Sequence, residues 1–180
     1  MSRIDPAQPP YAEEVQKTFD RLMPPGVPPL VLFTTLARSP RAFAKFMAAG
    51  LLDKGPLPLR EREIMIHRTC ARTGSEYEWG VHVALFAERV GFSRDDVRAT
   101  VAPGSGGWSP REALIVRLAD ELHEEASIGE ELWPALRREF TAEQILELIM
   151  LAGFYRTVAY LTNGLTLPLE SYGARFAQYG

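Results

Sequence analysis

Apolar side chains recur with the period of an α-helix along almost the whole chain. No segment alternates apolar and polar residues between hairpin turns, as a half-buried strand would. The sequence therefore predicts an all-α fold. We expect short helices over 11–22 and 30–36, and a third that begins at Pro40 with Ser39 as its N-cap. Later helices are expected over 95–101, 109–126, 129–140 and 141–163.

Length and charge limit the classes of protein that this chain fits. With 180 residues, 46% of them hydrophobic, it is long enough for one compact domain with a real core. We expect residues 1–24 to form a helical extension and residues 25–180 to form the domain. A net charge of −3 leaves no basic surplus to displace counterions from a phosphate backbone, so nucleic acid is not expected as a partner.

The single cysteine, Cys70, excludes an intrachain disulfide and every CxxC motif. The N-terminal residues include no apolar stretch typical of a secretory signal. The most apolar segment, 145–155, contains Glu147 and is shorter than a membrane span. We therefore expect a cytoplasmic protein without a membrane partner, with 145–155 in a buried helix.

Two consecutive helices are predicted over 58–73 and 75–90, each followed by a glycine in the position of a helix C-terminus. On a helical wheel, Glu63 falls inside the apolar arc of the first helix. Burial of an unpaired carboxylate is costly, so we expect a partner, and His67 is the nearest candidate. A structural Glu–His pair and a functional carboxylate are equally compatible with this pattern.

A polar edge borders the apolar stripe of the second helix and consists of Ser75, Glu78, His82 and Arg89. Such an edge suits a small apolar pocket with a few convergent polar groups. Glu78 and His82 are four residues apart, so the carboxylate can orient the imidazole and raise its pKa. A structural alternative exists, because Ser75 and Glu78 also fit a capping box and a lone histidine is often structural.

The glycine-rich segment 103–107 lacks the Lys-Ser or Lys-Thr of a phosphate-binding P-loop, and no strand precedes it. We interpret it as a connector. Two Glu-x-x-x-His pairs raise the question of a metal, but di-iron bundles use Glu-x-x-His with further glutamates. No metal site is therefore predicted.

The segments 57–63, 73–82 and 89–93 resemble the carboxymuconolactone decarboxylase family, which shares its fold with alkylhydroperoxidase D. The similarity extends more weakly over 25–170, including 153–159. This resemblance implies an all-helical subunit with the alkylhydroperoxidase D fold that assembles into homo-oligomers, as trimers or hexamers.

The peroxidase branch of this fold has the pattern C-x-x-C-x-x-x-H, with a glutamate twelve residues before the first cysteine. Here Ser75 and Glu78 stand at the cysteine positions, His82 matches the histidine and Glu63 matches the relay glutamate. Thiol–disulfide exchange requires thiols, so CxxC-type peroxidase activity is disfavoured. The resemblance instead implies a cofactor-independent lyase that decarboxylates a small carboxylated lactone by acid/base catalysis.

The resemblance also implies roles for four catalytic candidates. We expect His82 to act as general acid or as donor to the developing oxyanion, and Glu63 to orient it or relay its proton. Glu78 would set the imidazole tautomer or hold a water, and Ser75 would supply a hydroxyl. Isomerisation, hydration or hydrolysis with the same residues stays open, as does a non-catalytic helical oligomer subunit.

Overall fold

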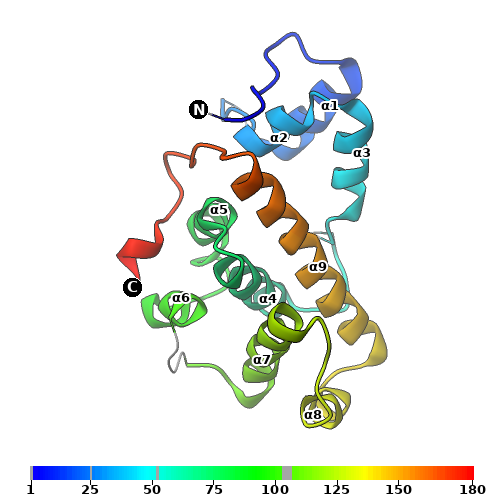
Figure 1. Cartoon of the computed structure of the whole chain (residues 1–180), viewed down its shortest axis with the longest axis vertical. Helices are drawn as coiled ribbons and strands as arrows, with labels where there is room; N and C mark the ends of the chain where they lie inside the picture. Colours follow the sequence, from blue (N-terminus) through cyan, green and yellow to red (C-terminus); the bar gives the residue numbers. More distant parts are fainter. Residues whose placement is uncertain (1, 25, 52, 103–106) are drawn as a thin grey trace.

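The computed structural model describes residues 2–24, 26–51, 53–102 and 107–180. These residues form nine α-helices and one 3-10 helix, with no strand among them, which confirms the all-α prediction (Figure 1). In chain order the elements are α1 (Glu13–Leu22), α2 (Val31–Leu36), α3 (Pro40–Ala49), α4 (Leu59–Arg72), α5 (Glu76–Phe86), α6 (Arg94–Val101), α7 (Pro110–Glu125), α8 (Leu132–Glu139), α9 (Ala142–Gly164) and η1 (Phe176–Gln178).

Side-chain caps start several of these helices where the sequence predicts them. The Ser39 hydroxyl accepts a hydrogen bond from the backbone of α3, and Ser109 and Thr141 form capping boxes at α7 and α9. Gly74 follows α4 with φ +64°, a left-handed conformation that favours glycine. The start of the predicted connector, 103–106, lies outside the described residues.

Helix α5 ends earlier than predicted, at Phe86 instead of Val90. The chain continues in turns as far as Gly91, which has φ +69°. The Phe92 amide donates to the Ala87 carbonyl across these turns. Gly91 therefore ends the turns after the helix, not the helix itself.

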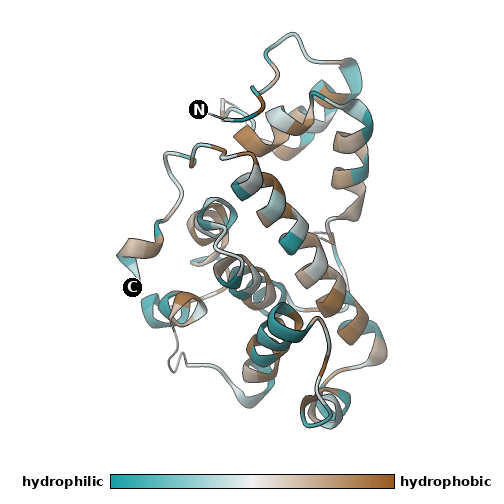
Figure 2. Cartoon of the chain, viewed as in Figure 1, coloured by the Kyte–Doolittle hydropathy of each residue, from teal (hydrophilic) through white to brown (hydrophobic). Residues whose placement is uncertain are grey.

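Helix α4 is the centre of the fold and packs against α5, α6, α7 and α9 (Figure 1). All residues from 61 to 70 are buried, including the charged ones. Helix α5 is also buried on every side over 77–83, and Figure 2 shows apolar residues along much of α5 and α9. The buried charged residues of α4 need hydrogen-bond or ion-pair partners, and α5 and α9 pack directly against this helix.

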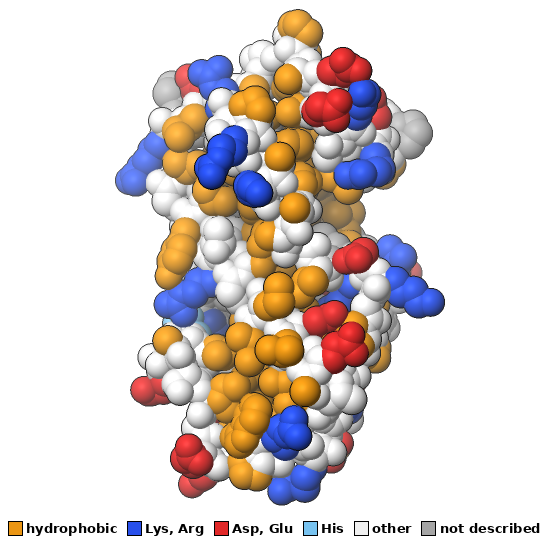
Figure 3. Space-filling model, turned by 90° about the vertical axis from the view of Figure 1, so that its right-hand side faces the viewer, with side chains coloured by type: hydrophobic (Ala, Val, Ile, Leu, Met, Phe, Trp, Pro, Cys, Tyr) orange, Lys and Arg blue, Asp and Glu red, His pale blue; other side chains and the backbone are white. Residues whose placement is uncertain are grey.

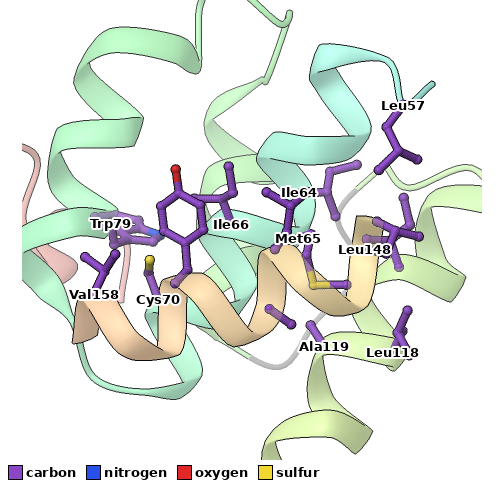
Figure 4. Packing of buried hydrophobic residues seen from close by; sticks show 14 of the residues in the cluster. Leu57, Ile64, Met65, Ile66, Cys70, Trp79, Leu118, Ala119, Leu148 and Val158 are labelled. Carbon is purple, nitrogen blue, oxygen red and sulfur yellow. The ribbon is translucent and has the colours of Figure 1, made fainter. Parts of the chain in front are cut away.

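The main core joins apolar residues from α4, α5, α7 and α9, as Figure 4 shows in close view. Cys70 belongs to this core and is completely buried near Trp79 and Val158 (Figure 4). Met65 and Leu148 are completely buried in the same cluster. The core thus surrounds the polar groups of α4 on several sides.

Helices α1 to α3 form a smaller cluster of their own around Val15, Phe19 and Phe43. The rings of Phe19 and Phe43 meet edge to face with centroids 5.5 Å apart. Phe33 of α2 contacts both this cluster and the main core. The division of the chain at residue 24 stays a prediction.

The C-terminal segment after α9 lies across α5. The Ala174 amide donates to the Gly80 carbonyl at 3.0 Å, and a Cβ on Gly80 would lie 2.3 Å from the Ala174 carbonyl oxygen. Glu170 accepts hydrogen bonds from Tyr77 and from the first backbone amide of α2. Phe176 packs on Trp79 with ring centroids 4.9 Å apart. Glycine at position 80 is thus needed for close approach of this segment.

Helix α9 has a buried face and an exposed apolar face. Leu146, Met150 and Tyr160 lie on one side of the helix and are 62%, 56% and 64% exposed. On the face of the molecule that Figure 3 presents, many hydrophobic side chains are exposed next to one another. Among the described helices, α9 alone has the length and composition of a membrane span, and 44% of its most apolar window is buried in the protein.

Candidate functional site

Glu63 and His82 form the centre of the candidate site. Glu63 of α4 is completely buried, and the Nδ1–H of His82 on α5 donates to its Oε2 at 2.8 Å. The predicted neighbour His67 has a different main contact, since its Nδ1 lies 2.7 Å from the Glu63 backbone carbonyl and 3.4 Å from Oε2. The buried carboxylate therefore has a partner on the next helix, nineteen residues away.

The pKa values of these groups fix their charges. Burial opposes ionisation of both Glu63 and His82, but their mutual attraction outweighs it. The pKa of Glu63 is lowered, and the pKa of His82 is raised to about 10. Burial lowers the pKa of His67 to about 4, so its imidazole stays neutral. At neutral pH the core thus contains one imidazolium–carboxylate pair beside a neutral histidine.

The second nitrogen of His82 points to α9. Its Nε2 lies 3.2 Å from the hydroxyl of Tyr155, which is 1% exposed, and 3.4 Å from Oε1 of Glu78. Burial, and then the charges of Glu78 and Glu63, raise the pKa of Tyr155 well above its ordinary value, so the phenol keeps its proton. Phe86 stacks on the imidazole with centroids 5.1 Å apart. Protonated His82 can therefore donate to Tyr155 through Nε2.

The capping box, which is the structural alternative for Ser75 and Glu78, does not form. The Ser75 side chain makes no capping bond at α5, and its hydroxyl lies 3.0 Å from that of Thr162 on α9. Helix α9 packs against this end of α5 and offers the buried hydroxyl a partner, which replaces the local bond. Capping therefore does not explain either residue.

The structure buries three of the four residues of the predicted polar edge, and it places Glu78 and His82 3.4 Å apart. Ser75, Glu78 and His82 are 0%, 7% and 4% exposed, and they are buried between helices instead of bordering an apolar stripe. Arg89 is exposed outside the group, with its guanidinium over the Phe86 ring. The four catalytic candidates, Glu63, Ser75, Glu78 and His82, are all buried on α4 and at α5.

Three buried polar atoms of this site have no hydrogen-bond partner among the described residues. They are Oε1 of Glu63, Oε2 of Glu78 and Nε2 of His67. Unsatisfied buried polar atoms cost free energy, and their accumulation in one place is typical of sites that bind water or a polar ligand. Two pockets in the described part of the chain are lined by other side chains.

Cys70 lies close enough to the candidate site for the charges of Glu63 and Glu78 to affect the pKa of its thiol. Burial, with the charges of Glu78 and Glu63, raises the pKa of this thiol well above its ordinary value. The thiol is therefore protonated and enclosed in the core. In the described part of the chain, no three histidine, cysteine or acidic residues form a cluster suited to a metal ion.

Sequence reasoning missed Tyr155 and Thr162, both on α9. Each supplies a hydroxyl to a residue of α5 or its cap from more than seventy positions away. The available signal was a polar hydroxyl inside an apolar helix, because a buried tyrosine usually finds a hydrogen-bond partner. Which partner it finds depends on how α9 packs.

Comparison with known proteins identifies a matching family and structures with the same fold. Residues 37–121, which contain Glu63, Ser75, Glu78 and His82, match the model of the carboxymuconolactone decarboxylase family. No curated protein matches the whole chain or part of it significantly.

Three solved structures share the fold. A peroxidase-related protein from Silicibacter sp. TM1040 has 21% identity and a TM-score of 0.77, with 97% of this chain and 95% of that chain covered. An alkylhydroperoxidase AhpD core protein from Ralstonia eutropha JMP134 has 21% identity and a TM-score of 0.68, with coverages of 94% and 93%. The debrominase Bmp8 in complex with 2,3,4-tribromopyrrole has 17% identity and a TM-score of 0.72, with coverages of 94% and 92%. At these identities, the likeness establishes the fold.

Proposed function

Because residues 37–121 match the model of the carboxymuconolactone decarboxylase family, we propose that this protein is a cofactor-independent carboxy-lyase. Its substrate is a small carboxylated lactone or a related compound of aromatic catabolism. A cytoplasmic location accompanies this proposal and is based on the lone cysteine and on the packing of α9.

The observation that carries the proposal is the 2.8 Å bond between His82 and Glu63. It stabilises a cationic imidazole in the core and raises its pKa to about 10, although burial alone would lower it. His82 therefore has a proton to give at neutral pH. The other ring nitrogen, Nε2, faces Tyr155 and Glu78. The proton that His82 gives up therefore leaves from Nε2.

This arrangement suits decarboxylation next to an unsaturated lactone. The bond to the carboxylate carbon breaks, carbon dioxide leaves, and the electron pair delocalises into the lactone carbonyl as a dienolate. Donors at the oxyanion stabilise the dienolate, and a general acid then protonates it on carbon. We assign this proton to Nε2 of His82, which gives it directly or through the Tyr155 hydroxyl. Glu63 keeps the imidazole protonated until the transfer.

Glu78 and Ser75 have supporting roles in this proposal. Glu78 lies 3.4 Å from the Nε2 of His82 and has a second oxygen without a hydrogen-bond partner among the described residues, which suits it to hold a water or a substrate hydroxyl. The Ser75 hydroxyl is engaged with Thr162, so it serves to fix the start of α5 against α9 unless substrate displaces that bond.

Two other functions remain as candidates. Isomerisation, hydration or hydrolysis would use the same proton on a related substrate. A non-catalytic helical subunit is favoured by one observation: His82 is only 4% exposed, and neither described pocket reaches it. The test must therefore distinguish the product as well as the presence of turnover.

The test is turnover of 4-carboxymuconolactone by the wild type, His82→Gln and Glu61→Gln, followed both as carbon dioxide release and by product analysis. Glu61 is a matched control because it lies on α4 but pairs with Arg111, not with His82. We expect carbon dioxide release by the wild type and Glu61→Gln, and its loss in His82→Gln. Turnover without carbon dioxide would favour isomerisation or hydrolysis, and equal turnover by all three proteins would eliminate the role of His82.

A further inference from the structure

A concave site lies away from the Glu63–His82 pair, between α4, α7 and α9. It is a cavity of about 440 Å³ and shares no lining residue with the candidate active site. Leu122 of α7 and Ile149 of α9 provide apolar walls, and Thr69 and Thr73 of α4 and its C-cap add hydroxyl groups. This volume suits a small ligand with an apolar body.

Arg156 supplies the charge of this cavity. Its Nε donates to the Tyr160 hydroxyl at 2.8 Å, and Nη1 donates to the His123 carbonyl at 3.3 Å. In the described part of the chain, no carboxylate forms an ion pair with it, whereas neighbouring Arg72 pairs with Asp120 and Glu124. Arg156 is therefore positioned by neutral groups and keeps its positive charge available.

The pKa of His123, which lines the cavity, indicates the electrostatic potential there. Burial lowers its pKa, and so do the positive charges of Arg72 and Arg156, which outweigh the opposite effects of Glu124 and Asp120. The remaining carboxylate at the rim, Glu125, is exposed to solvent. The wall next to Arg156 is thus positive and partly shielded from water, where charge-assisted hydrogen bonds are strong.

We propose that this cavity binds a small carboxylic acid with an apolar body, whose carboxylate pairs with Arg156 and whose body lies against Leu122 and Ile149. A guanidinium without an ion-pair partner matches a carboxylate in geometry as well as in charge. The proposal is independent of the decarboxylase proposal, because the two sites use different side chains. Gly153 also lines the cavity, and a Cβ added there would have no atom within 4 Å, so a larger residue would enter the space.

The test uses octanoate as the probe and NMR titration of the full chain, with octanol as a probe of the same length but no charge. We expect octanoate to shift the amide signals around Thr73 and Gly153, and octanol to bind more weakly. Arg156→Gln should weaken octanoate binding by about tenfold or more, from the usual strength of a charge-assisted hydrogen bond. Gly153→Leu should abolish the shifts by filling the cavity.

Two control variants establish whether octanoate binds at this cavity and not elsewhere on the protein. Arg98→Gln removes an exposed arginine of α6 and should leave octanoate binding unchanged, and His82→Gln should leave it unchanged as well. Circular dichroism and sedimentation confirm that each variant has the fold and association state of the wild type. No shift at millimolar octanoate, equal affinity in Arg156→Gln, or binding lost only in His82→Gln would overturn the proposal.

Discussion

The Nδ1 of His82 and the Oε2 of Glu63 are 2.8 Å apart in the interior of the helical core, where both side chains are almost fully buried. Each group is ionised because of the other, since burial alone would favour the neutral form of both. The ionised form of His82 on α5 therefore depends on Glu63 of α4, and removal of either partner takes away the charge that compensates the other.

We predict that Glu63→Gln lowers the pKa of His82 from about 10, because the attraction of the Glu63 carboxylate is lost and Glu78 alone then opposes desolvation. Loss of one partner of a buried ion pair costs about 3–5 kcal/mol of unfolding free energy, and loss of the proton-holding group lowers turnover by about 10² or more. NMR titration of the imidazole and chemical denaturation measure both effects. Glu61→Gln is the control, and an unshifted His82 in Glu63→Gln would contradict the assignment.

The pH dependence of stability follows from two histidines with opposite shifts. The pKa of His82 is raised from 6.5 to about 10, so its stabilising contribution is complete below pH 6.5 and is lost as pH rises towards 10. The pKa of His67 is lowered from 6.5 to about 4, so the unfolded chain binds a proton first and stability falls as pH drops from 6.5 towards 4. Together they predict a maximum of unfolding free energy near pH 6.5.

His67→Asn tests the acidic side of this profile, because an amide can still donate to the Glu63 carbonyl but does not titrate. We expect the unfolding free energy of the variant to depend less on pH between 6.5 and 4, with the alkaline side unchanged. Urea denaturation at a series of pH values gives both slopes. Identical acidic slopes in the two proteins would show that His67 is not the group responsible.

Tyr155→Phe removes one hydroxyl from a side chain that is otherwise buried in the core. The ring is retained, so we expect the fold to persist, while His82 Nε2 loses its 3.2 Å partner. If the hydroxyl relays the proton, kcat should fall by about 10-fold to 100-fold with little change in KM. Tyr172→Phe, a change at a 44% exposed tyrosine, is the matched control. An unchanged kcat would show that His82 transfers its proton without Tyr155.

The sequence was sufficient to predict the order of the helices because the signals for each one are local. Ser39, Ser109 and Thr141 cap the helices that follow them, and Gly74 ends α4 as expected. The placement of Glu63 in an apolar arc likewise required only helical geometry. These features depend on residues within a few positions of one another.

The contacts that define the site depend instead on packing between helices. Periodicity placed His67 nearest to Glu63, but the hydrogen bond to its carboxylate comes from His82 on another helix. Ser75 fitted a local cap, yet Thr162 of α9 provides the partner that its hydroxyl uses. A capping pattern states which bonds are possible, and only the position of α9 decides between them.

Homo-oligomer formation stays a prediction, and the structure indicates where to test it. Leu146 and Met150 are one turn apart on the exposed face of α9, and soluble monomers seldom expose large apolar patches. We expect sedimentation to show a trimer or a hexamer for the wild type. Met150→Glu should shift the protein towards monomer, whereas Leu85→Glu, at a 54% exposed leucine of α5, serves as the control. A monomeric wild type at all concentrations would eliminate the prediction.

The same substitution at two helical glycines should have opposite effects on stability. A Cβ at Gly80 would lie 2.3 Å from the Ala174 carbonyl oxygen, and this oxygen belongs to the backbone, so no side-chain rotation relieves the contact. We expect Gly80→Ala to reduce the unfolding free energy by about 1–3 kcal/mol, the usual cost of overpacking. The C-terminal segment should also move from α5, which changes the fluorescence of Trp79 because Phe176 packs on it.

Gly153→Ala is the matched variant, because Gly153 also lies inside a helix but has no atom within 4 Å of the added Cβ. Alanine has a higher helix propensity than glycine, so this change should raise stability by up to about 1 kcal/mol. Denaturation of both variants, with the fluorescence of Trp79 as a second signal, checks the pair. Equal stability of Gly80→Ala and the wild type would mean that the C-terminal segment is not held against α5 in solution.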